Sequence, residues 1–368
     1  MHTKTVLITG ATGLVGSYLV RVFLENSYRV YALARGNAKE TPEQRVISVL
    51  NFWDETTLNK KSDNLYILEG DITKEKLGLD ESIIDLLKKE VDEVLHCAAL
   101  TKLNSSLNDL RKVNVTGTEN ILKLCVSWNN NAKLKKISYI STIFIYGDYS
   151  GAFDENNGDV GQKFNTFYEQ SKFEAEKLVE QYRNRGLWID IFRPCAVIGE
   201  SITGKIPSFN YALQQLIYIW SKGLLDYFPA GYSLKACFID ELCQSIFHIS
   251  SKSIEKNKTY HPFGPDLLSL EKLLNLSVEF FGFKKLNVVS REKFIKKSTP
   301  SQALLLKHNI FFINTNVKIF SKTTNRILLS YNFNFSKFTK PLMLNILSYP
   351  ITKSFMMTPN DDKKNKEV

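Results

Sequence analysis

Residues 6–16 read Val6-Leu7-Ile8-Thr9-Gly10-Ala11-Thr12-Gly13-Leu14-Val15-Gly16. Apolar and β-branched residues run into three glycines spaced by three, and a helical pattern begins directly after the third glycine. In such a strand–turn–helix unit, glycines allow a tight turn and a close approach of the backbone to a pyrophosphate, and the first N–H groups of the helix face the anion. The stretch therefore predicts a dinucleotide-binding unit at the start of a parallel sheet.

The first half of the chain continues this alternation. We expect strands at Thr5–Thr9, Arg29–Ala34, Asn64–Glu69, Glu93–His96, Lys136–Ser141 and Trp188–Arg193. Between them, helical periodicity covers Gly16–Asn26, Ser82–Glu90, Thr116–Trp128 and Thr166–Arg185. Six strands that alternate with helices predict an α/β fold with a doubly wound parallel Rossmann sheet.

The texture of the sequence changes after Arg193, where glycine and proline become frequent and an apolar helical stretch follows at 209–220. We expect a smaller, mostly helical C-terminal substrate-binding region to begin there. Residues 1–200 are predicted to form the dinucleotide-binding Rossmann domain. A strand at Ala236–Ile239, a helix at Asp240–Ser250 and a strand at Tyr260–Gly264 should return to it, which places the returning segments near 236–264. Residues 201–235 and 265–358 would form the substrate-binding region, and 359–368 a disordered tail.

The charge of the chain is concentrated at its C-terminal end. The formal net charge is +10, from 48 Lys and Arg against 38 Asp and Glu; residues 251–368 contribute +12 and residues 1–250 contribute −2. Nucleic-acid binding by the main domain would require basic side chains along its own groove, so this distribution argues against a nucleic-acid partner.

The five cysteines are scattered and form no Cys-x-x-Cys pair, as is typical of reduced thiols in a cytoplasmic protein. The five histidines are not paired with cysteines or carboxylates at ligand spacing, so no metal site is predicted. No apolar run reaches the ~18 residues that a membrane-spanning helix requires.

Tyr168 and Lys172 lie four residues apart in a predicted helix, which places both side chains on one helix face. A phenol with a pKa near ~10 is a poor acid or base at neutral pH unless a nearby cation stabilises its phenolate. We therefore expect Lys172 to lower the pKa of Tyr168.

The glycine pattern, together with Gly70-Asp71-Ile72, Cys97-Ala98-Ala99 and Asn114-Val115-Thr116-Gly117, resembles the extended branch of the short-chain dehydrogenase/reductases. Counting back from Tyr146-Gly147, Thr142 occupies the hydroxyl position of that family's catalytic triad, and Ser141 is the less favoured choice. The resemblance implies Thr142, Tyr168 and Lys172 as catalytic residues. The cofactor-binding residues that we expect are Gly10, Thr12, Gly13, Leu14, Val15, Gly16, Arg35, Asp71, Ile72, Cys97, Ala98, Ala99, Asn114, Tyr168, Lys172 and Pro194.

The end of the second strand indicates which cofactor is used. An NAD-preferring enzyme places an acidic residue there, whereas this chain has Arg35, whose cation suits a 2′-phosphate. The sequence predicts NADPH, with Arg45 or Lys39 as further contacts to the phosphate.

Two segments indicate the class of substrate. Residues 165–179, around Tyr168, and residues 192–204, with Phe192-Arg193-Pro194 and the turn Ser201–Gly204, resemble the branch that contains fatty acyl-CoA reductases ("male sterility" proteins) and terminal thioester reductases. The resemblance implies reduction of an acyl-CoA or acyl-carrier thioester to the aldehyde or on to the alcohol, with the apolar helix after Ser201–Gly204 forming part of the acyl pocket. Two alternatives stay open: an extended reductase, dehydrogenase or epimerase acting on a keto-acyl, sterol-like or nucleotide-sugar substrate, and a non-catalytic NADPH sensor or scaffold.

The basic Phe/Lys-rich C-terminal region has three interpretations at this point. It could attract an acidic carrier protein or the phosphates of coenzyme A. It could rest on an anionic membrane as a peripheral contact. It could also reflect genome composition alone. The oligomeric state is left open.

Overall fold

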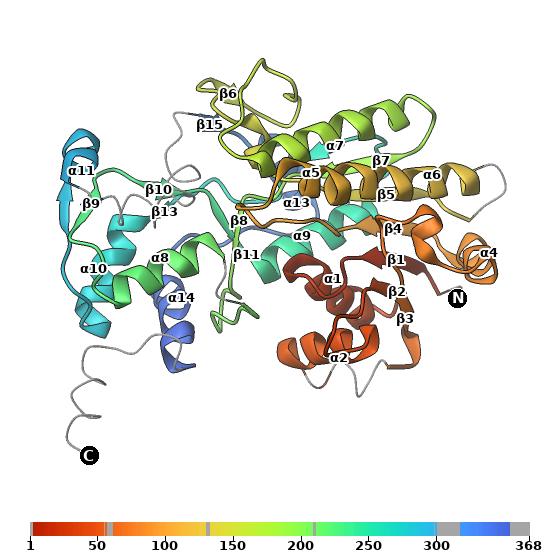
Figure 1. Cartoon of the computed structure of the whole chain (residues 1–368), viewed down its shortest axis with the longest axis horizontal. Coiled ribbons are helices and arrows are strands. Elements are labelled where there is room, and N and C mark those ends of the chain that lie inside the picture. Colours follow the sequence, from red (N-terminus) through yellow and green to blue (C-terminus); the bar gives the residue numbers. More distant parts are fainter. Residues whose placement is uncertain are drawn as a thin grey trace. The chain divides into compact units, whose positions relative to one another are not determined.

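The computed structural model describes residues 3–54, 56, 62–129, 133–208, 211–297, 299 and 317–353. The chain divides into two compact units. Unit 1 comprises Met1–Cys195, Leu242–Pro262 and Lys318–Asn334, and unit 2 comprises Ala196–Glu241, Phe263–Val317 and Phe335–Val368. The parallel sheet belongs to unit 1 (Figure 1). The predicted tail, 359–368, lies outside the described residues.

The central sheet has seven strands, all parallel. In spatial order they are β12 (Thr259–Tyr260), β7 (Ile189–Phe192), β5 (Lys136–Ile140), β4 (Glu93–His96), β1 (Thr5–Thr9), β2 (Arg29–Ala34) and β3 (Leu65–Glu69). The doubly wound Rossmann sheet is confirmed, and the six predicted strands agree with the structure to within one residue at each end. The strand order reverses at β1, between β2 and β4, and such a switch point opens a crevice at the carboxyl ends of the strands.

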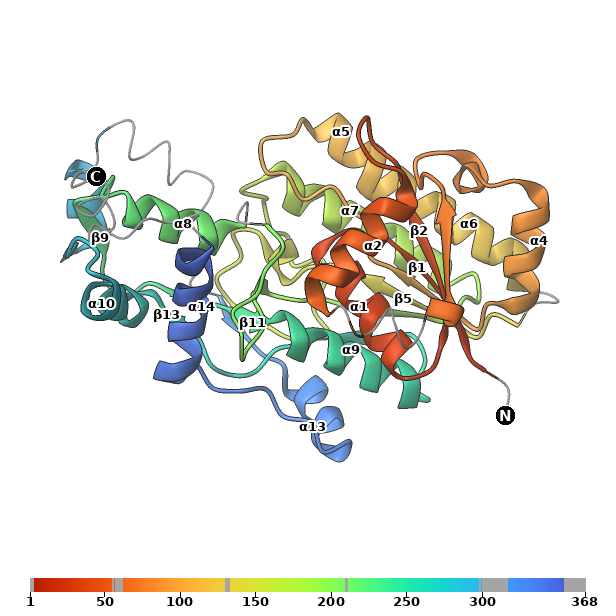
Figure 2. The same cartoon turned by 90° about the horizontal axis from the view of Figure 1, so that it is seen from below.

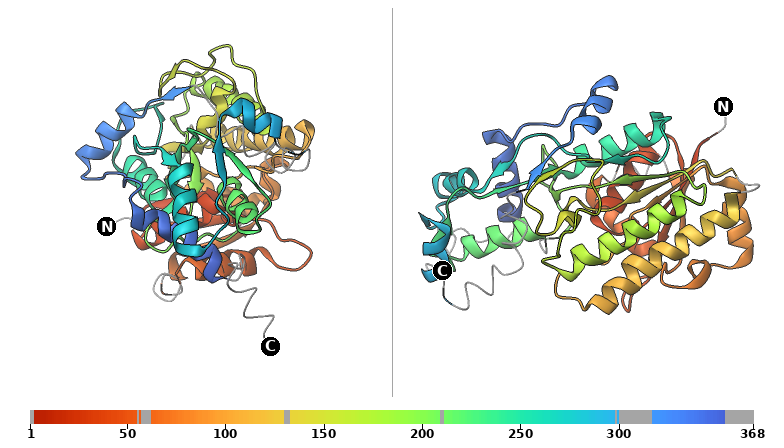
Figure 3. Two further views of the ribbon diagram at one scale, coloured as in Figure 1. Left: turned by 90° about the vertical axis from the view of Figure 1, so that its left-hand side faces the viewer. Right: turned by 90° about the horizontal axis from the view of Figure 1, so that it is seen from above.

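Helices cover both faces of this sheet, which explains why its strands are nearly continuous apolar runs. Helices α6 and α7 lie side by side on one face, and α1 and α9 cover the other (Figures 2 and 3). The helices with residues in unit 1 are α1 (Leu14–Glu25), α2 (Pro42–Trp53), α4 (Glu81–Glu90), α5 (Leu107–Arg111), α6 (Gly117–Asn129), α7 (Phe167–Arg183), α9 (Ile239–Lys252) and α13 (Lys322–Ser330). A π-helical turn, Lys112–Thr116, joins α5 to α6.

A buried ion pair fixes α7 against β7. The Arg193 guanidinium, which follows β7, donates from Nη2 to Oε2 of Glu176 at 2.7 Å and from Nε to both carboxylate oxygens at 3.1 Å. Its Nη1 donates to the Asn157 carbonyl at 2.6 Å. Both side chains of the pair are at most 6% exposed, so each charge depends on the other for its stabilisation.

Residues 318–334 pack with unit 1, although the sequence assigned them to the substrate-binding region. Strand β15 (Lys318–Ile319) pairs with β6 (Ala152–Phe153). The backbone N–H and the hydroxyl of Thr324 both donate to Glu155, and Thr324 Oγ1 accepts from the His261 backbone N–H. These long-range bonds have no local signature, which is why the sequence did not predict them.

Unit 2 contains short two-stranded sheets and four helices in its described residues. They are β8 (Ala196–Ile198) with β11 (Ala236–Phe238), β9 (Tyr227–Pro229) with β14 (Asn287–Val289), and β10 (Ser233–Leu234) with β13 (Leu268–Ser269), together with α8 (Ala212–Ser221), α10 (Leu270–Phe281), α11 (Arg291–Lys297) and α14 (Lys340–Thr352). The prediction that Ala236–Ile239 returns to the main sheet is wrong: this strand pairs with β8 in a separate ladder. A strand of three residues does not encode its partner, because alternation over so short a run fits either sheet.

We predict that Arg193→Leu destabilises unit 1 by about 3–5 kcal/mol, because it leaves the Glu176 carboxylate buried and unpaired. The control is Arg111→Leu, which removes an exposed pair with Glu174 and should change the unfolding free energy far less. Urea unfolding followed by circular dichroism measures both. Equal stability losses in the two variants would contradict the assigned role of the buried pair.

Candidate active site

The glycine turn after β1 is shaped for close backbone contact. Gly10 has φ +69°, and a Cβ there would lie 2.7 Å from Ala98 Cα. A Cβ on Gly16 would lie 2.2 Å from the Gly10 carbonyl oxygen. The turn is closed by a hydrogen bond from the Gly13 N–H to the Gly10 carbonyl at 2.9 Å. Neither Gly10 nor Gly16 can therefore carry a side chain without opening the turn.

The N-terminus of α1 offers its N–H groups to a ligand. The helix begins at Leu14, its N-cap is Gly13 with no side-chain capping bond, and its first turn contains no acidic residue. Thr12, Gly13, Leu14 and Val15 are at least partly exposed. An uncapped helix start beside a glycine cradle suits a pyrophosphate, so the residues present fit a dinucleotide cofactor.

Arg35 and Asp71 lie at the ends of β2 and β3 and face each other. Arg35 Nη1 lies 3.4 Å from Asp71 Oδ2, and the Arg35 side chain is 60% exposed. Burial alone would raise the pKa of Asp71, but hydrogen bonds from the Thr73 N–H and hydroxyl and the charge of Arg35 together lower it. Arg45 donates to the Arg35 carbonyl oxygen, so this predicted helper contacts Arg35 rather than projecting freely. The exposed guanidinium of Arg35 is available to a ligand at this edge.

The segment after β4 is fixed by two side chains. The Ala98 N–H donates to Thr9 Oγ1 at 3.2 Å. The Asn114 amide accepts from the Leu100 N–H at 2.7 Å and donates to the Leu100 carbonyl at 3.0 Å and to Ser171 Oγ at 2.9 Å. Asn114 is 1% exposed, so its side chain supports the backbone of 97–100 and α7. The cofactor contact that we expected of Asn114 stays a prediction.

Other predicted cofactor residues surround this segment. The Ile72 carbonyl accepts from Asn120, and Ile72 Cδ1 packs so closely on Gly117 that a Cβ there would lie 2.6 Å away. The Pro194 carbonyl accepts from the Ile143 N–H at 2.9 Å, which ties the end of β7 to the segment after β5. Cys97 and Ala99 are partly exposed. All these residues follow strand ends at one edge of the sheet.

The helix that carries Tyr168 and Lys172 begins at a capping box. Thr166 Oγ1 accepts from the Glu169 N–H at 3.2 Å, and Glu169 Oε2 accepts from the Asn165 N–H at 2.8 Å and from the Thr166 N–H at 3.4 Å. Reciprocal capping fixes the first helical turn, and Tyr168 is its second residue. The Thr-x-x-Glu pattern at 166–169 is a sequence signal for the start of this helix.

Tyr168 is hydrogen-bonded to Thr142. Thr142 is 4% exposed and caps the short helix Ile143–Tyr146 after β5, accepting from the Phe144 N–H at 3.3 Å. Burial raises the pKa of Tyr168 to about 12, although the bond with Thr142 lowers it. In the protein alone the effect of burial therefore dominates, and the phenol is protonated at neutral pH; the lowering of this pKa by Lys172 stays a prediction.

Lys172 is 2% exposed and its ammonium points into unit 1. Its Nζ donates to the Tyr139 hydroxyl at 2.8 Å and to the Ile140 carbonyl at 2.9 Å. Burial lowers the pKa of Lys172 to about 8, while Glu176 and Cys97 act in the opposite direction. The sequence analysis missed Tyr139, because nothing in the pattern of a buried strand distinguishes a polar partner from a core aromatic residue.

The cysteines and carboxylates of the described residues show no other reactive arrangement. Burial raises the pKa of Cys97 to about 12, so its thiol is neutral. Among the described residues, no cluster of three or more His, Cys, Asp and Glu side chains could hold a metal ion. No helix in that same part of the chain is long and apolar enough to cross a membrane.

Unit 2 holds the predicted substrate elements. The turn after β8 is fixed because the Ser201 N–H and hydroxyl donate to Asp240 at 3.0 and 2.6 Å and Asn345 donates to the Ser201 carbonyl at 3.0 Å. The apolar side chains of α8, including Leu216 and Trp220, are buried in the core of unit 2. The structure gives them a packing role, and a contact of α8 with an acyl chain stays a prediction.

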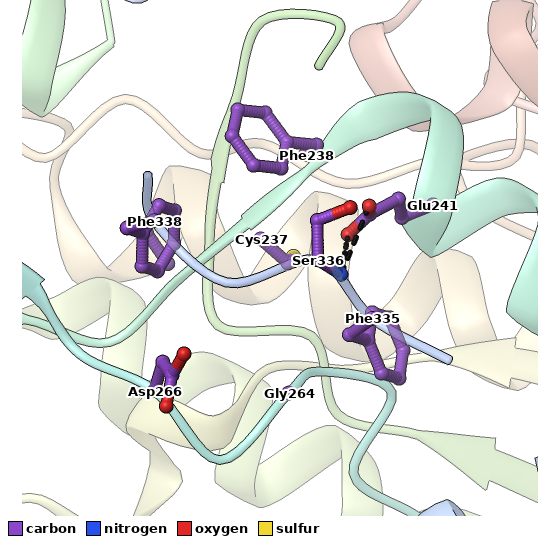
Figure 4. Close-up of a pocket in the computed structure, with 9 residues that line it drawn as sticks. Cys237, Phe238, Glu241, Gly264, Asp266, Phe335, Ser336 and Phe338 are labelled. Carbon is purple, nitrogen blue, oxygen red and sulfur yellow. Dashed lines mark hydrogen bonds between the residues drawn. The ribbon is translucent and has the colours of Figure 1, made fainter. Parts of the chain in front are cut away.

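A small pocket also lies in unit 2 (Figure 4). It is lined by Ala236, Cys237, Phe238, Glu241, Gly264, Asp266, Phe335, Ser336 and Phe338. The Ser336 N–H donates to the Glu241 carboxylate at 3.1 and 3.3 Å, so this carboxylate is already engaged. The pocket combines three phenylalanines with two carboxylates and includes none of the predicted catalytic residues.

The sequence of this chain is similar to a known protein family and to parts of longer known proteins. A sequence model of the family described as "Male sterility protein", an NAD-binding domain, matches residues 8–246. A linear gramicidin synthase of Brevibacillus parabrevis is 27% identical over 293 residues, which cover 76% of this chain and 6% of that protein. The large chain of L-2-aminoadipate reductase of Penicillium chrysogenum is 32% identical over 233 residues, covering 58% of this chain and 16% of that protein. The chain thus spans less than a fifth of the length of either relative.

Among solved structures, the terminal R domain of the myxalamid PKS–NRPS biosynthetic pathway superposes with a TM-score of 0.82. The two chains are 24% identical, and the superposition covers 98% of this chain and 93% of that one. At this identity the likeness establishes the fold: a Rossmann sheet followed by a smaller C-terminal region.

We predict that Gly16→Ala weakens binding of NADPH at least ~10-fold, because the new Cβ collides with the Gly10 carbonyl and opens the turn. Gly158→Ala is the control, since the nearest atom to its Cβ lies 3.9 Å away. Quenching of tryptophan fluorescence by NADPH measures both. If Gly16→Ala bound NADPH as tightly as the wild type, the glycine turn would not be the cofactor cradle.

Proposed function

The chain belongs to the male sterility family of NAD-binding domains, within the extended short-chain dehydrogenase/reductases, and we propose that it reduces an acyl thioester with NADPH. The observation that carries this proposal is the protonated, partly exposed Tyr168, hydrogen-bonded to Thr142 and one helical turn from the buried Lys172. These residues follow strands of the sheet whose switch point carries the glycine cradle.

A reductase requires a proton donor at the carbonyl oxygen, and Tyr168 meets that requirement. With a pKa of about 12, the phenol holds its proton until negative charge develops on a bound oxygen. Thr142 offers a second hydroxyl to the same oxygen. Lys172 has three ammonium protons, two of which are donated to Tyr139 and Ile140, which leaves one for a cofactor hydroxyl.

The reaction balances as one thioester, one NADPH and one proton giving one aldehyde, one thiol and NADP⁺. When bound, the cofactor supplies the hydride to the carbonyl carbon. Thr142 and Tyr168 would hold the oxygen of the tetrahedral adduct, and its collapse breaks the carbon–sulfur bond and releases the thiolate. No acyl-enzyme is needed, in keeping with the neutral Cys97 thiol. A second hydride would carry the aldehyde to the alcohol.

The relatives support a thioester substrate but belong to much longer proteins. We propose that the thioester is carried by an acidic carrier protein or by coenzyme A, supplied by a separate chain or domain. A basic surface in unit 2 supports this. Five exposed lysines lie on and beside β14 and α11: Lys284, Lys285, Lys293, Lys296 and Lys297. Such a surface attracts phosphates or acidic side chains.

The experiment that tests the proposal follows NADPH oxidation by the purified chain with acyl-CoAs, an acyl-carrier protein, a β-keto ester and a UDP-sugar. We expect oxidation only with the thioesters, together with an aldehyde trapped as its hydrazone. Tyr168→Phe should lower kcat at least ~100-fold and leave the Kd for NADPH within about two-fold. Oxidation with the β-keto ester or the UDP-sugar but with neither thioester would overturn the proposed substrate.

Arg35 makes a separate prediction about the cofactor. Because its exposed guanidinium suits a 2′-phosphate, Arg35→Ser should weaken NADPH binding about 10- to 100-fold and leave NADH binding unchanged. Arg21→Ser, on the outer side of α1, is the control for the loss of one positive charge. Isothermal titration calorimetry with both cofactors measures the affinities. An equal loss of affinity for NADPH and for NADH would show that Arg35 does not bind the 2′-phosphate.

A further inference from the structure

The buried ammonium of Lys172 has no counter-ion of its own. The carboxylate of Glu176, one helical turn further along α7, is bound to Arg193 by three hydrogen bonds. The two acceptors that Lys172 contacts, the Tyr139 hydroxyl and the Ile140 carbonyl, are neutral and both come from β5. The Tyr139 ring adds a cation–π contact, with Nζ 4.4 Å from its centroid. These two oxygens are the hydrogen-bond acceptors of the charged form of Lys172, and the charge of Glu176 acts in the same direction.

The direction of each hydrogen bond around Tyr139 follows from counting protons. The Thr118 hydroxyl has one proton and donates it to the Asn114 carbonyl at 2.6 Å. The remaining contacts of Thr118 Oγ1 must then be donors to it: His96 through Nε2–H at 3.0 Å, and the Tyr139 hydroxyl. Tyr139 thus donates its hydroxyl proton to Thr118, and its oxygen accepts the hydrogen bond from Lys172.

The chain of bonds continues to the first strand. Because Nε2 of His96 carries the proton, Nδ1 accepts from the Thr9 hydroxyl at 2.8 Å. Thr9 Oγ1 accepts in turn from the Ala98 N–H, in the segment beside the glycine turn. Burial lowers the pKa of His96 to about 3, so the imidazole ring is neutral at neutral pH. The donor and the acceptor in each of these hydrogen bonds therefore stay the same.

We infer that Tyr139 is a positioning residue for Lys172: oriented by Thr118 and His96, it holds the ammonium in its charged form and directs the one remaining N–H toward the cofactor. Tyr139 is 1% exposed and accepts a hydrogen bond from the Lys172 ammonium, so we assign it a role that is exerted through Lys172. The inference deepens the proposed function, on which it rests for the catalytic role of Lys172.

Five titratable groups act on Lys172 or lie against it. Tyr168 and Glu176 share its helix, Tyr139 comes from β5, and His96 and Cys97 come from the end of β4. Glu176 is held by Arg193 and does not contact Tyr139 by a hydrogen bond, so replacing Tyr139 leaves that ion pair in place. Removing the Tyr139 oxygen takes away an acceptor of the charged form, so the pKa of Lys172 must fall below its value of about 8.

The test is an NMR titration of the full chain labelled with [ε-13C]lysine, in which the Lys172 signal is assigned by its absence in Lys172→Arg. We expect a midpoint near pH 8 for the wild type and a midpoint about 1 pH unit lower for Tyr139→Phe. Thr118→Val, which removes the acceptor of the Tyr139 proton, should shift the midpoint in the same direction, and Thr118→Ser should restore it. Tyr260→Phe, which loses a phenol hydrogen bond to Ser253 elsewhere in unit 1, is the control and should change nothing.

The alkaline limb of kcat/KM against pH should move with the midpoint, since the charged Lys172 is lost at lower pH in Tyr139→Phe. An unchanged Lys172 midpoint in folded Tyr139→Phe would overturn the inference. If that variant does not fold, identical midpoints for Thr118→Val and Thr118→Ser would overturn it instead. The titration needs no substrate, so shifted midpoints without any thioester turnover would reject the proposed function and leave the positioning role intact.

Discussion

A positive charge buried beside β5 is the constraint on which the candidate site depends. Lys172 is held there by a phenol oxygen and a backbone carbonyl of that strand, so α7 must pack on β5 in one register. The capping box at Thr166 fixes where this helix begins, and the pair between Glu176 and Arg193 fixes it against β7. Tyr168 then emerges beside Thr142 as a consequence of how Lys172 is buried.

The two ends of the Tyr168–Lys172 pair lie in different surroundings, and this division suits a reduction. Tyr168 is partly exposed and keeps its proton, which a growing oxyanion can take. Lys172 is 2% exposed, and its charge is supported by its hydrogen bonds to β5 and by the nearby Glu176 carboxylate. A phenol that keeps its proton at neutral pH can donate it to an oxygen that gains negative charge.

The features that could be predicted from the sequence are those that depend on short stretches of neighbouring residues. The glycines of 10–16 and the apolar runs of the six strands specify the Rossmann sheet to within one residue. Helix α2 was missed, although Thr41, Pro42 and Gln44 form a readable capping box at its start. Tyr139, Thr118 and His96 were not predictable, because their hydrogen bonds to one another and to Lys172 join residues 21 to 33 positions apart, and no sequence motif has this spacing. The place of 318–334 in unit 1 likewise rests on long-range bonds to Glu155 and His261.

Transfer of deuterium from [4-2H]NADPH tests the central claim most directly, namely that this site delivers a hydride to a thioester carbonyl while Tyr168 supplies the proton. The purified chain would be given an acyl thioester and the cofactor labelled on the transferred position, and the product would be analysed by mass spectrometry. The account predicts one deuterium at C1 of the aldehyde, or two at C1 of the alcohol, and formation of labelled product at least ~100-fold more slowly with Tyr168→Phe. An aldehyde without deuterium, or a fully labelled product from Tyr168→Phe at the wild-type rate, would contradict it.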